Sequence, residues 1–118
     1  DNISLNNCVI DAPKQFRRSN GIKLEDVRFS NAQETMWNCS DIELSRVSVK
    51  GDYFGFGSKD IYAEKLDVDG NYIFDGAKNV TVRNSRLISK DAFWNCEDVV
   101  VENCEIVGEY LGKQGGHC

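Results

Sequence analysis

A 19-residue repeat constrains the fold of this chain more than any other feature. Residues 79–87 (NVTVRNSRL) return 19 positions later as residues 98–106 (DVVVENCEI), and the same pattern extends along the whole chain. A unit this short cannot bury its own apolar side chains and has to stack on its neighbours. The sequence therefore predicts a solenoid.

Apolar residues form columns at this spacing. The first column holds Ile3, Ile22, Ile42, Ile61, Val80 and Val99, and the second holds Leu5, Leu24, Leu44, Ala63, Val82 and Val101. The next two hold Cys8, Val27, Val47, Leu66, Ser85 and Cys104, then Ile10, Phe29, Val49, Val68, Leu87 and Ile106. Within each pair of columns the residues are two positions apart, which is the period of a strand with one buried face.

Residues that favour bends stand immediately before the first column. They are Asn2, Gly21, Asp41, Asp60, Asn79 and Asp98. Asn, Asp and Gly tolerate a left-handed backbone or cap a bend through the side chain. We therefore expect the chain to bend at each of these positions.

A looser apolar column predicts a third strand in each repeat. Its members are Phe16, Met36, Phe54, Ile73, Phe93 and Leu111, and a column of small residues follows it: Ser19, Cys39, Gly57, Gly76, Cys96 and Gly115. We assign the one additional residue of the third repeat to a bulge or widened bend at residues 55–57 (GFG).

Together these patterns predict an all-β, right-handed parallel β-helix over residues 1–112, with six coils of about 19 residues. Coils stacked about 4.8 Å apart would make a rod roughly 29 Å long. Residues 113–118 (KQGGHC) are interpreted as a Gly-rich tail of non-native origin. A leucine-rich repeat is the competing fold, but the chain has few Leu residues and three apolar segments in each repeat.

Three repeat phrases carry a resemblance to a known family. Residues 91–96 (DAFWNC), 101–104 (VENC) and 108–112 (GEYLG) are similar to phrases of an uncharacterised bacterial family of parallel β-helix proteins, the DUF3737 group. The resemblance covers residues 1 to about 112 and implies a right-handed β-helix, with no activity attached. Because members of that family are much longer, this chain resembles a middle fragment.

Charge and hydropathy exclude several classes of partner. The net charge of −5 disfavours a nucleic-acid partner, which would require a basic face. No apolar run approaches the roughly 18 residues of a membrane span, so no membrane partner is expected. The chain opens on Asp1 rather than Met, which we interpret as a processed chain or a piece of a longer one.

Four of the five cysteines follow an Asn and are expected to be buried free thiols: Cys8, Cys39, Cys96 and Cys104. The columns separate Cys8 from Cys104 by about 24 Å and Cys39 from Cys96 by about 14 Å. A disulfide requires Cα atoms within roughly 7 Å, so neither pair can form one. Free thiols favour a reducing, cytoplasmic location. No ligands cluster, so neither a metal nor a cofactor is expected, and His117 beside Cys118 lacks an organised catalytic pocket.

Stacked carboxylates are the candidate for an enzymatic function. The column two positions before the third apolar column reads Lys14, Glu34, Asp52, Asn71, Asp91 and Glu109. Acids about 4.8 Å apart could cleave a polysaccharide as acid and nucleophile, or bind Ca²⁺. Asn71 interrupts the run, and acids are common at bends. The alternative function is therefore a fragment of a carbohydrate-active hydrolase or lyase that uses Glu34, Asp52 and Asp91.

Aromatic residues give the preferred candidate site. The column after the third apolar column reads Arg17, Trp37, Gly55, Phe74, Trp94 and Gly112, with Phe56 able to replace Gly55. If side chains alternate as in a strand, Trp37, Phe56, Phe74 and Trp94 form an outward-facing aromatic strip suited to sugar stacking or protein docking. The alternative is that a bend turns these rings inward.

We therefore expect a non-enzymatic structural or binding scaffold that uses this aromatic strip, with a glycan among its candidate ligands. A solenoid also leaves unpaired backbone groups and an open core at each end. A regular coil that begins at Asn2 predicts end-to-end self-association, or pairing with the missing remainder of a longer parent.

Overall fold

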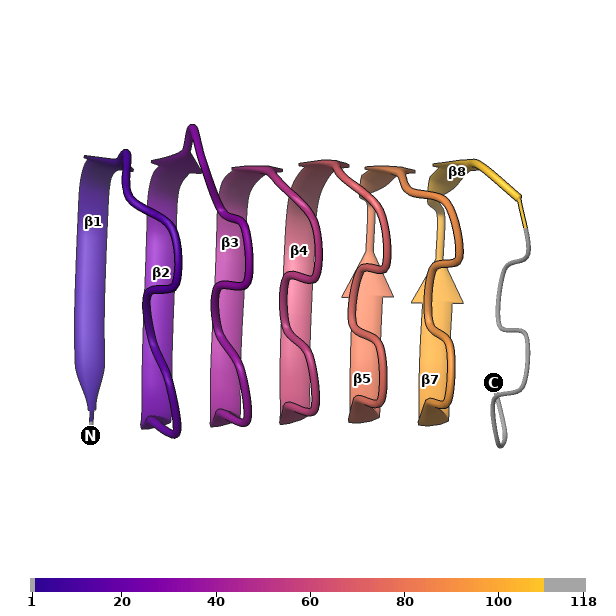
Figure 1. Cartoon of the computed structure of the whole chain (residues 1–118), viewed down its shortest axis with the longest axis horizontal. Helices are drawn as coiled ribbons and strands as arrows, with labels where there is room; N and C mark the ends of the chain where they lie inside the picture. Colours follow the sequence, from indigo (N-terminus) through magenta and orange to yellow (C-terminus); the bar gives the residue numbers. More distant parts are fainter. Residues whose placement is uncertain (1, 110–118) are drawn as a thin grey trace.

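The computed structural model describes residues 2–109, which fold into a right-handed parallel β-solenoid of about six turns (Figure 1). The strands are β1 (Ile3–Ile10), β2 (Asn20–Phe29), β3 (Ser40–Lys50), β4 (Lys59–Asp69), β5 (Lys78–Arg83), β6 (Arg86–Ile88), β7 (Glu97–Glu102) and β8 (Glu105–Val107). They follow the order β1-β2-β3-β4-β5-β7, and β6 pairs with β4 and β8. The predicted fold is confirmed, and the leucine-rich repeat is excluded because residues 2–109 contain no helix.

The solenoid is a short rod that measures 32 × 23 × 23 Å. Its length is close to the value expected from six stacked coils. In the described part of the chain, no helix is long and apolar enough to cross a membrane.

The parallel pairing follows the predicted apolar columns. Ile22 pairs with Ile3 on one side and with Ile42 on the other, and Leu24 pairs in the same way with Leu5 and Leu44. In β2, β3 and β4 the residues of all four columns are at most 3% exposed. Each inward side chain therefore packs between similar neighbours in the coils above and below it, which suits β-branched and aliphatic residues.

Left-handed residues make two bends along the first two sides of each coil, one before the first apolar column and one between the two pairs of columns. The predicted bend residues all have positive φ, between 55° and 83°: Asn2, Gly21, Asp41, Asp60, Asn79 and Asp98. A second set, not predicted, lies five positions later with φ between 51° and 57°: Asn7, Asp26, Arg46, Lys65, Asn84 and Asn103. This second bend divides the long strands between two sides of the coil. It explains why the second and third apolar columns are three positions apart, as at Leu24 and Val27, whereas the columns within each pair are two positions apart.

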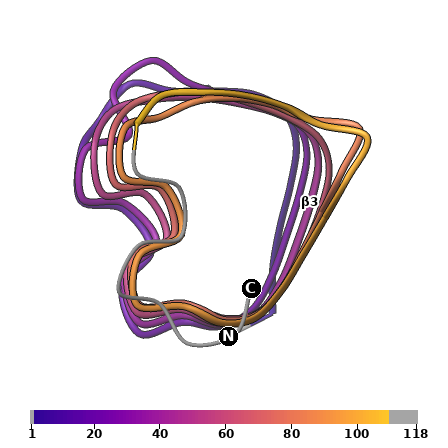
Figure 2. The same cartoon turned by 90° about the vertical axis from the view of Figure 1, so that its right-hand side faces the viewer.

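Within residues 2–109, the third side of the coils is not a strand, contrary to the prediction. Left-handed residues alternate there, as at Tyr53 (φ 59°) and Gly55 (φ 79°), and the backbone steps inward (Figure 2). Backbone hydrogen bonds still join successive coils: Tyr53 N–H donates to Asn71 O (2.9 Å), and Phe74 N–H donates to Phe54 O (2.8 Å). Neighbouring coils therefore stay connected on a side that lacks regular strand geometry.

The additional residue lies at a different corner from the predicted one. Ala32 N–H donates to Lys50 O, which aligns Ala32 with Gly51, 19 positions on, whereas Phe29 pairs with Val49, 20 positions on. The extra residue is thus at the corner 30–32 in the second coil, not at residues 55–57. As a consequence, the predicted columns on the third side are shifted by one position in the third and fourth coils.

The column of small residues shows this shift. Cys39 N–H donates to Ser58 Oγ in the next coil (3.1 Å), and both residues are buried. Ala77 is also fully buried and donates its N–H to Phe74 O (3.1 Å). The inward column therefore contains Ser58 and Ala77, rather than the predicted Gly57 and Gly76.

Five phenylalanine rings run through the core along the rod. The members of this phenylalanine ladder are Phe16, Phe29, Phe54, Phe74 and Phe93. Successive ring centroids lie 6.3, 5.8, 6.0 and 5.9 Å apart. These separations fall within the range of favourable aromatic pairs, so the ladder links the first five coils.

A corner of small residues carries the chain from the second side to the third. Its members are Ala32, Gly51, Gly70, Ser89 and Gly108, and each is 19 positions from the next. Successive coils approach closely here: a β carbon on Gly70 would overlap the carbonyl group of Gly51. The small-residue corner therefore exists because no larger side chain fits between these backbones.

The cysteines of residues 2–109 are free, as predicted. Cys39 and Cys96 are buried, whereas Cys8 and Cys104 are half-buried. The Cys39 thiol donates to Phe16 O (3.0 Å), and burial raises the pKa of this thiol above its ordinary value. Cys118, together with the rest of the Gly-rich tail 113–118, lies outside the described residues.

Candidate functional site

The third side of the solenoid carries half-exposed aromatic side chains, but not the full set that the sequence predicted. Trp37 and Phe56 lie in adjacent coils with ring centroids 4.9 Å apart and an interplanar angle of 44°. Trp94 is half-buried on the same side, further along the rod. Phe74 was assigned wrongly, because its side chain is fully buried in the phenylalanine ladder.

The one-residue shift on the third side explains why Phe74 is buried and does not face outward. Gly57 N–H donates to Asp75 O (2.8 Å) and Gly76 N–H donates to Trp94 O (2.7 Å), which aligns Phe56, Asp75 and Trp94 in one column. The outward column therefore reads Arg17, Trp37, Phe56, Asp75 and Trp94. An acidic residue, and not a phenylalanine, separates Phe56 from Trp94.

Two tyrosines complete the aromatic group, and the sequence reasoning missed them. Tyr53 and Tyr72 stack with centroids 4.6 Å apart and an interplanar angle of 12°. Tyr53 also contacts Trp37 edge to face, at 6.5 Å, and lies 6.4 Å from Phe56. Their spacing of 19 residues was the available signal, but the sequence analysis assigned neither tyrosine to a column. Trp37, Tyr53, Phe56 and Tyr72, all half-buried, are called the aromatic surface below.

Polar contacts hold the indole of Trp37 in place. Its Nε1–H donates to Tyr53 O in the next coil (2.7 Å). The guanidinium of Arg17 lies 4.6 Å from the centre of the indole ring, a cation–π contact. Arg17 is in turn held by Glu34, through the side-chain carboxylate (3.5 Å) and the backbone carbonyl (3.2 Å). The indole is therefore fixed before any ligand binds.

The three acids of the enzymatic alternative do not form one column. Glu34 N–H donates to Asp52 O, which aligns Glu34 with Tyr53, and Tyr72 N–H donates to Lys90 O, which aligns Tyr72 with Asp91. The two stacked tyrosines therefore separate Glu34 from Asp91.

Asp52 lies at the neighbouring corner and has a structural contact of its own. Its Oδ1 accepts a hydrogen bond from Asn71 N–H (2.9 Å), and Asn71 Oδ1 accepts one from Lys90 N–H (3.0 Å). These side chains satisfy backbone donors between coils. Within residues 2–109 no three His, Cys, Asp or Glu side chains come close enough to hold a metal ion.

A different pair of acids lies beside the aromatic surface. Asp91 is 6% exposed, and no donor among the described residues reaches its buried Oδ1. Asp75 is half-buried and accepts a hydrogen bond from Asn95 Nδ2 (3.4 Å). Burial raises the pKa of the Asp75 carboxyl, and the negative charge of Asp91 raises it further, against the effect of the Asn95 hydrogen bond.

The aromatic surface and this acid pair share one electrostatic environment. Burial raises the pKa of the Tyr53 phenol, interaction with the neighbouring Tyr72 phenol raises it further, and so do the negative charges of Asp75, Asp52 and Asp91. The aromatic surface therefore adjoins a region of excess negative charge along the same side of the rod.

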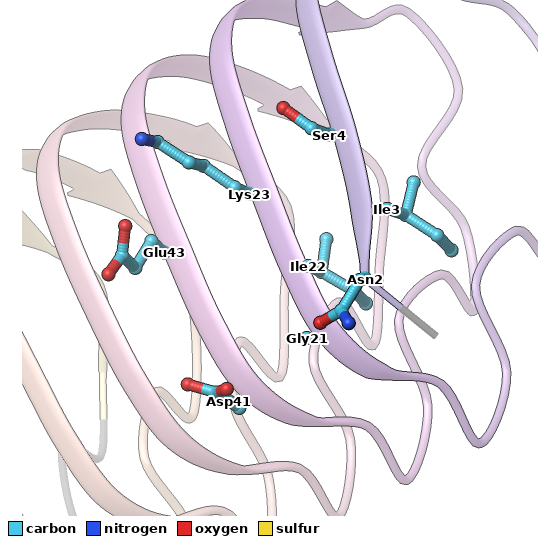
Figure 3. Close-up of a pocket in the computed structure, with 8 residues that line it drawn as sticks. All are labelled: Asn2, Ile3, Ser4, Gly21, Ile22, Lys23, Asp41 and Glu43. Atoms are coloured by element: carbon cyan, nitrogen blue, oxygen red, sulfur yellow. The ribbon is translucent and has the colours of Figure 1, made fainter.

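A shallow hollow of about 240 Å³ over β1, β2 and β3 is a less suitable site (Figure 3). Its outward side chains include Lys23, Asp41 and Glu43, which are spread along the face of the sheet and do not converge on a common point. It contains no aromatic residue. We therefore place the candidate site on the third side of the coil.

A comparison with protein families gives one finding. A family model described as "Protein of unknown function (DUF3737)" matches residues 1–116. No curated protein and no solved structure matches the chain.

Proposed function

Because the chain belongs to the DUF3737 family, for which no activity is described, we propose a function from its surface chemistry. The protein is a non-enzymatic binding scaffold that takes a glycan on its aromatic surface. The observation that carries this proposal is the pair of Trp37 and Phe56, whose rings lie 4.9 Å apart and are half-exposed on adjacent coils.

The chemistry of the aromatic surface suits a sugar. Trp and Tyr rings present large apolar faces beside polar tips, and the apolar C–H face of a sugar ring packs on them while its hydroxyl groups stay hydrated. The repeat places such rings in successive coils, so that one extended chain could contact several of them. The indole of Trp37 is already held by two neighbours, which lowers the entropy lost on binding.

The carbohydrate-active enzyme is not proposed as a second function. Its three candidate acids are divided between two columns, and Asp52 already accepts a backbone hydrogen bond. Asp91 is buried, which keeps it from a glycosidic bond. A reducing-end assay separates the two ideas, because a scaffold binds a polysaccharide without releasing new ends.

We also propose a cytoplasmic location. The cysteines described by the structure are free, and such thiols persist in reducing compartments. Titration of thiols in freshly unfolded protein, prepared without reductant, should find these cysteines free.

We further propose that copies of the chain associate end to end through β1. The β1 column residues Ile3, Leu5, Cys8 and Ile10 are only half-buried, whereas their partners in β2 are fully buried. A second copy that added its coil at the same parallel register would cover them, and so would a preceding coil of a longer parent chain. Light scattering at micromolar concentration should therefore give a mass above 13.3 kDa that rises with concentration. A folded species that stays monomeric would contradict this part of the proposal.

Replacing Trp37 by alanine should abolish glycan binding or weaken it at least about tenfold, because rigid aromatic residues carry most of the energy at such surfaces. An oligosaccharide array identifies the ligand, and calorimetry with that ligand measures the change. Trp37→Phe keeps a ring but loses the N–H group, so we expect it to retain part of the affinity.

The matched control is Tyr62→Ala. Tyr62 is an aromatic residue exposed on the outer face of β4, away from the aromatic surface. The far-UV circular dichroism of both variants should equal that of the unmodified protein. Equal affinity in Trp37→Ala, or equal losses in both variants, would show that the aromatic surface is not the binding site.

A further inference from the structure

Asp75 and Asp91 lie on the third side of the solenoid in successive coils. The inter-coil hydrogen bonds put Asp75 directly after Phe56 in the outward column and Asp91 directly after Tyr72 in the neighbouring one. The pair repeats the relation between Trp37 and Tyr53, which are also 16 residues apart and in direct contact across the same step. The two acids therefore take the backbone positions that the contacting aromatic residues Trp37 and Tyr53 take two coils earlier.

The charge of this acid pair is not compensated by the described residues. Asp91 is more than nine-tenths buried, and its Oδ1 has no donor within residues 2–109. Asp75 receives a single neutral donor, from Asn95. Burying carboxylates without a cationic partner is costly, so such a pair attracts a positive group.

The flanking rings define which cation fits. Phe56 and Trp94 lie on either side of Asp75 in its column, and Tyr72 adjoins Asp91. Aromatic faces attract ammonium groups through cation–π contacts. A divalent metal ion would instead require more oxygen ligands, and no cluster of three ligating side chains is present in the described part of the chain.

We propose that the Asp75–Asp91 pair binds the ammonium group of an amino sugar, and that the surface therefore selects glycans with free amino groups. This inference rests on the proposed glycan binding. Sugar rings stack on the aromatic surface, while the half-exposed Asp75 contacts the ammonium group. The buried charge of Asp91 adds long-range attraction without direct contact at Oδ1.

The test compares three β-linked hexasaccharides that differ only at the second carbon of each sugar: cellohexaose with hydroxyl groups, chitohexaose with acetamido groups, and the glucosamine hexamer with free amines. Calorimetry is performed at a pH at which the amines are protonated. The glucosamine hexamer should bind about tenfold more tightly than the other two, as a charge-assisted contact implies. Added salt should reduce this preference.

Two nearly isosteric substitutions test the assignment. In Asp75→Asn the preference should disappear, because the contacting carboxylate is lost, and in Asp91→Asn it should become smaller, while the weaker binding of cellohexaose remains. Asp69→Asn is the matched control, since Asp69 is an exposed acid in β4 and its loss changes the net charge equally. A preference that survives Asp75→Asn, or disappears in Asp69→Asn, would overturn the inference as non-specific attraction to an acidic protein.

The outcomes also separate this inference from the proposed function. If all three hexasaccharides bind alike and Trp37→Ala removes the binding, the glycan-binding function stands and the selection for amino groups is wrong. If none of them binds and the oligosaccharide array is also negative, both are wrong. Stabilisation by CaCl₂, but not by the glucosamine hexamer, would overturn the inference in favour of a metal site.

Discussion

Replacing Phe74 by alanine is expected to lower the free energy of unfolding by about 3–5 kcal/mol. Phe74 is fully buried, and its ring lies 6.0 Å from that of Phe54 and 5.9 Å from that of Phe93. The substitution leaves a cavity in the middle of the phenylalanine ladder, and the neighbouring coils cannot close it because their backbones are joined above and below. Urea unfolding followed by circular dichroism measures the loss.

Phe56→Ala is the control for this prediction. Phe56 is the same type of residue in the preceding coil, but its side chain is half-exposed in the outward column. Its replacement should cost only about 1 kcal/mol. If Phe56→Ala destabilised the protein as much as Phe74→Ala, the register on the third side would be wrong, and the sequence-based assignment of Phe74 to the exterior would regain support.

Replacing Gly70 by alanine should cost about 3 kcal/mol or more, or prevent folding. The added β carbon would overlap the backbone carbonyl of Gly51 in the preceding coil. That carbonyl belongs to a corner in which Gly51 N–H donates to Asp69 O (3.1 Å) and Gly70 N–H donates to Ile88 O (3.0 Å), so the backbone has little freedom to move away. Thermal unfolding of the purified variant, or its absence from the soluble fraction, gives the result.

Gly76→Ala separates this steric effect from the general cost of replacing a glycine. Gly76 has a φ of 72°, but the nearest atoms to an added β carbon lie 3.9 Å away, in Gly57. Only the left-handed backbone is penalised there, by about 1–2 kcal/mol. A Gly70→Ala variant as stable as Gly76→Ala would mean that the coils do not approach closely at the small-residue corner.

The first two sides of the coil could be predicted from the sequence because they obey simple rules. Ile22, Leu24, Val27 and Phe29 all face the core, and Gly21 and its counterparts make the bends that were expected of them. On these sides strand alternation, apolar periodicity and bend chemistry all point to the same register.

The third side could not be predicted in the same way, because strand alternation does not hold there. Ile73 and Phe74 are consecutive in sequence and both are buried, which a left-handed residue permits and a regular strand does not. Sequence patterns alone therefore could not show whether residue 54 or residue 55 of the third coil aligns with the third apolar column of the neighbouring coils. That single position decided whether Phe74 or Asp75 faces outward, and with it the composition of the candidate site.

The column of stacked acids was predicted wrongly, and the Asp75–Asp91 pair was missed, for the same reason. Asp75 did not belong to any column of the sequence pattern, and Asp91 was grouped with Asp52, which lies in the neighbouring column. The burial of Asp91 depends on packing across coils, which has no signature in a single repeat.

The extra residue at the corner 30–32 indicates how this scaffold can change in length. The second coil accommodates one more residue than its neighbours, yet the pairing on both sides of the corner remains regular: Phe29 pairs with Val49, and Glu34 N–H donates to Asp52 O. The extra residue is accommodated within the corner itself, and the backbone pairing is regular again a few residues later. A peptide loop grafted between Ser30 and Ala32 would thus be displayed from the wall of the rod without disturbing the coils, which makes this corner a natural insertion point for engineered or evolved variants.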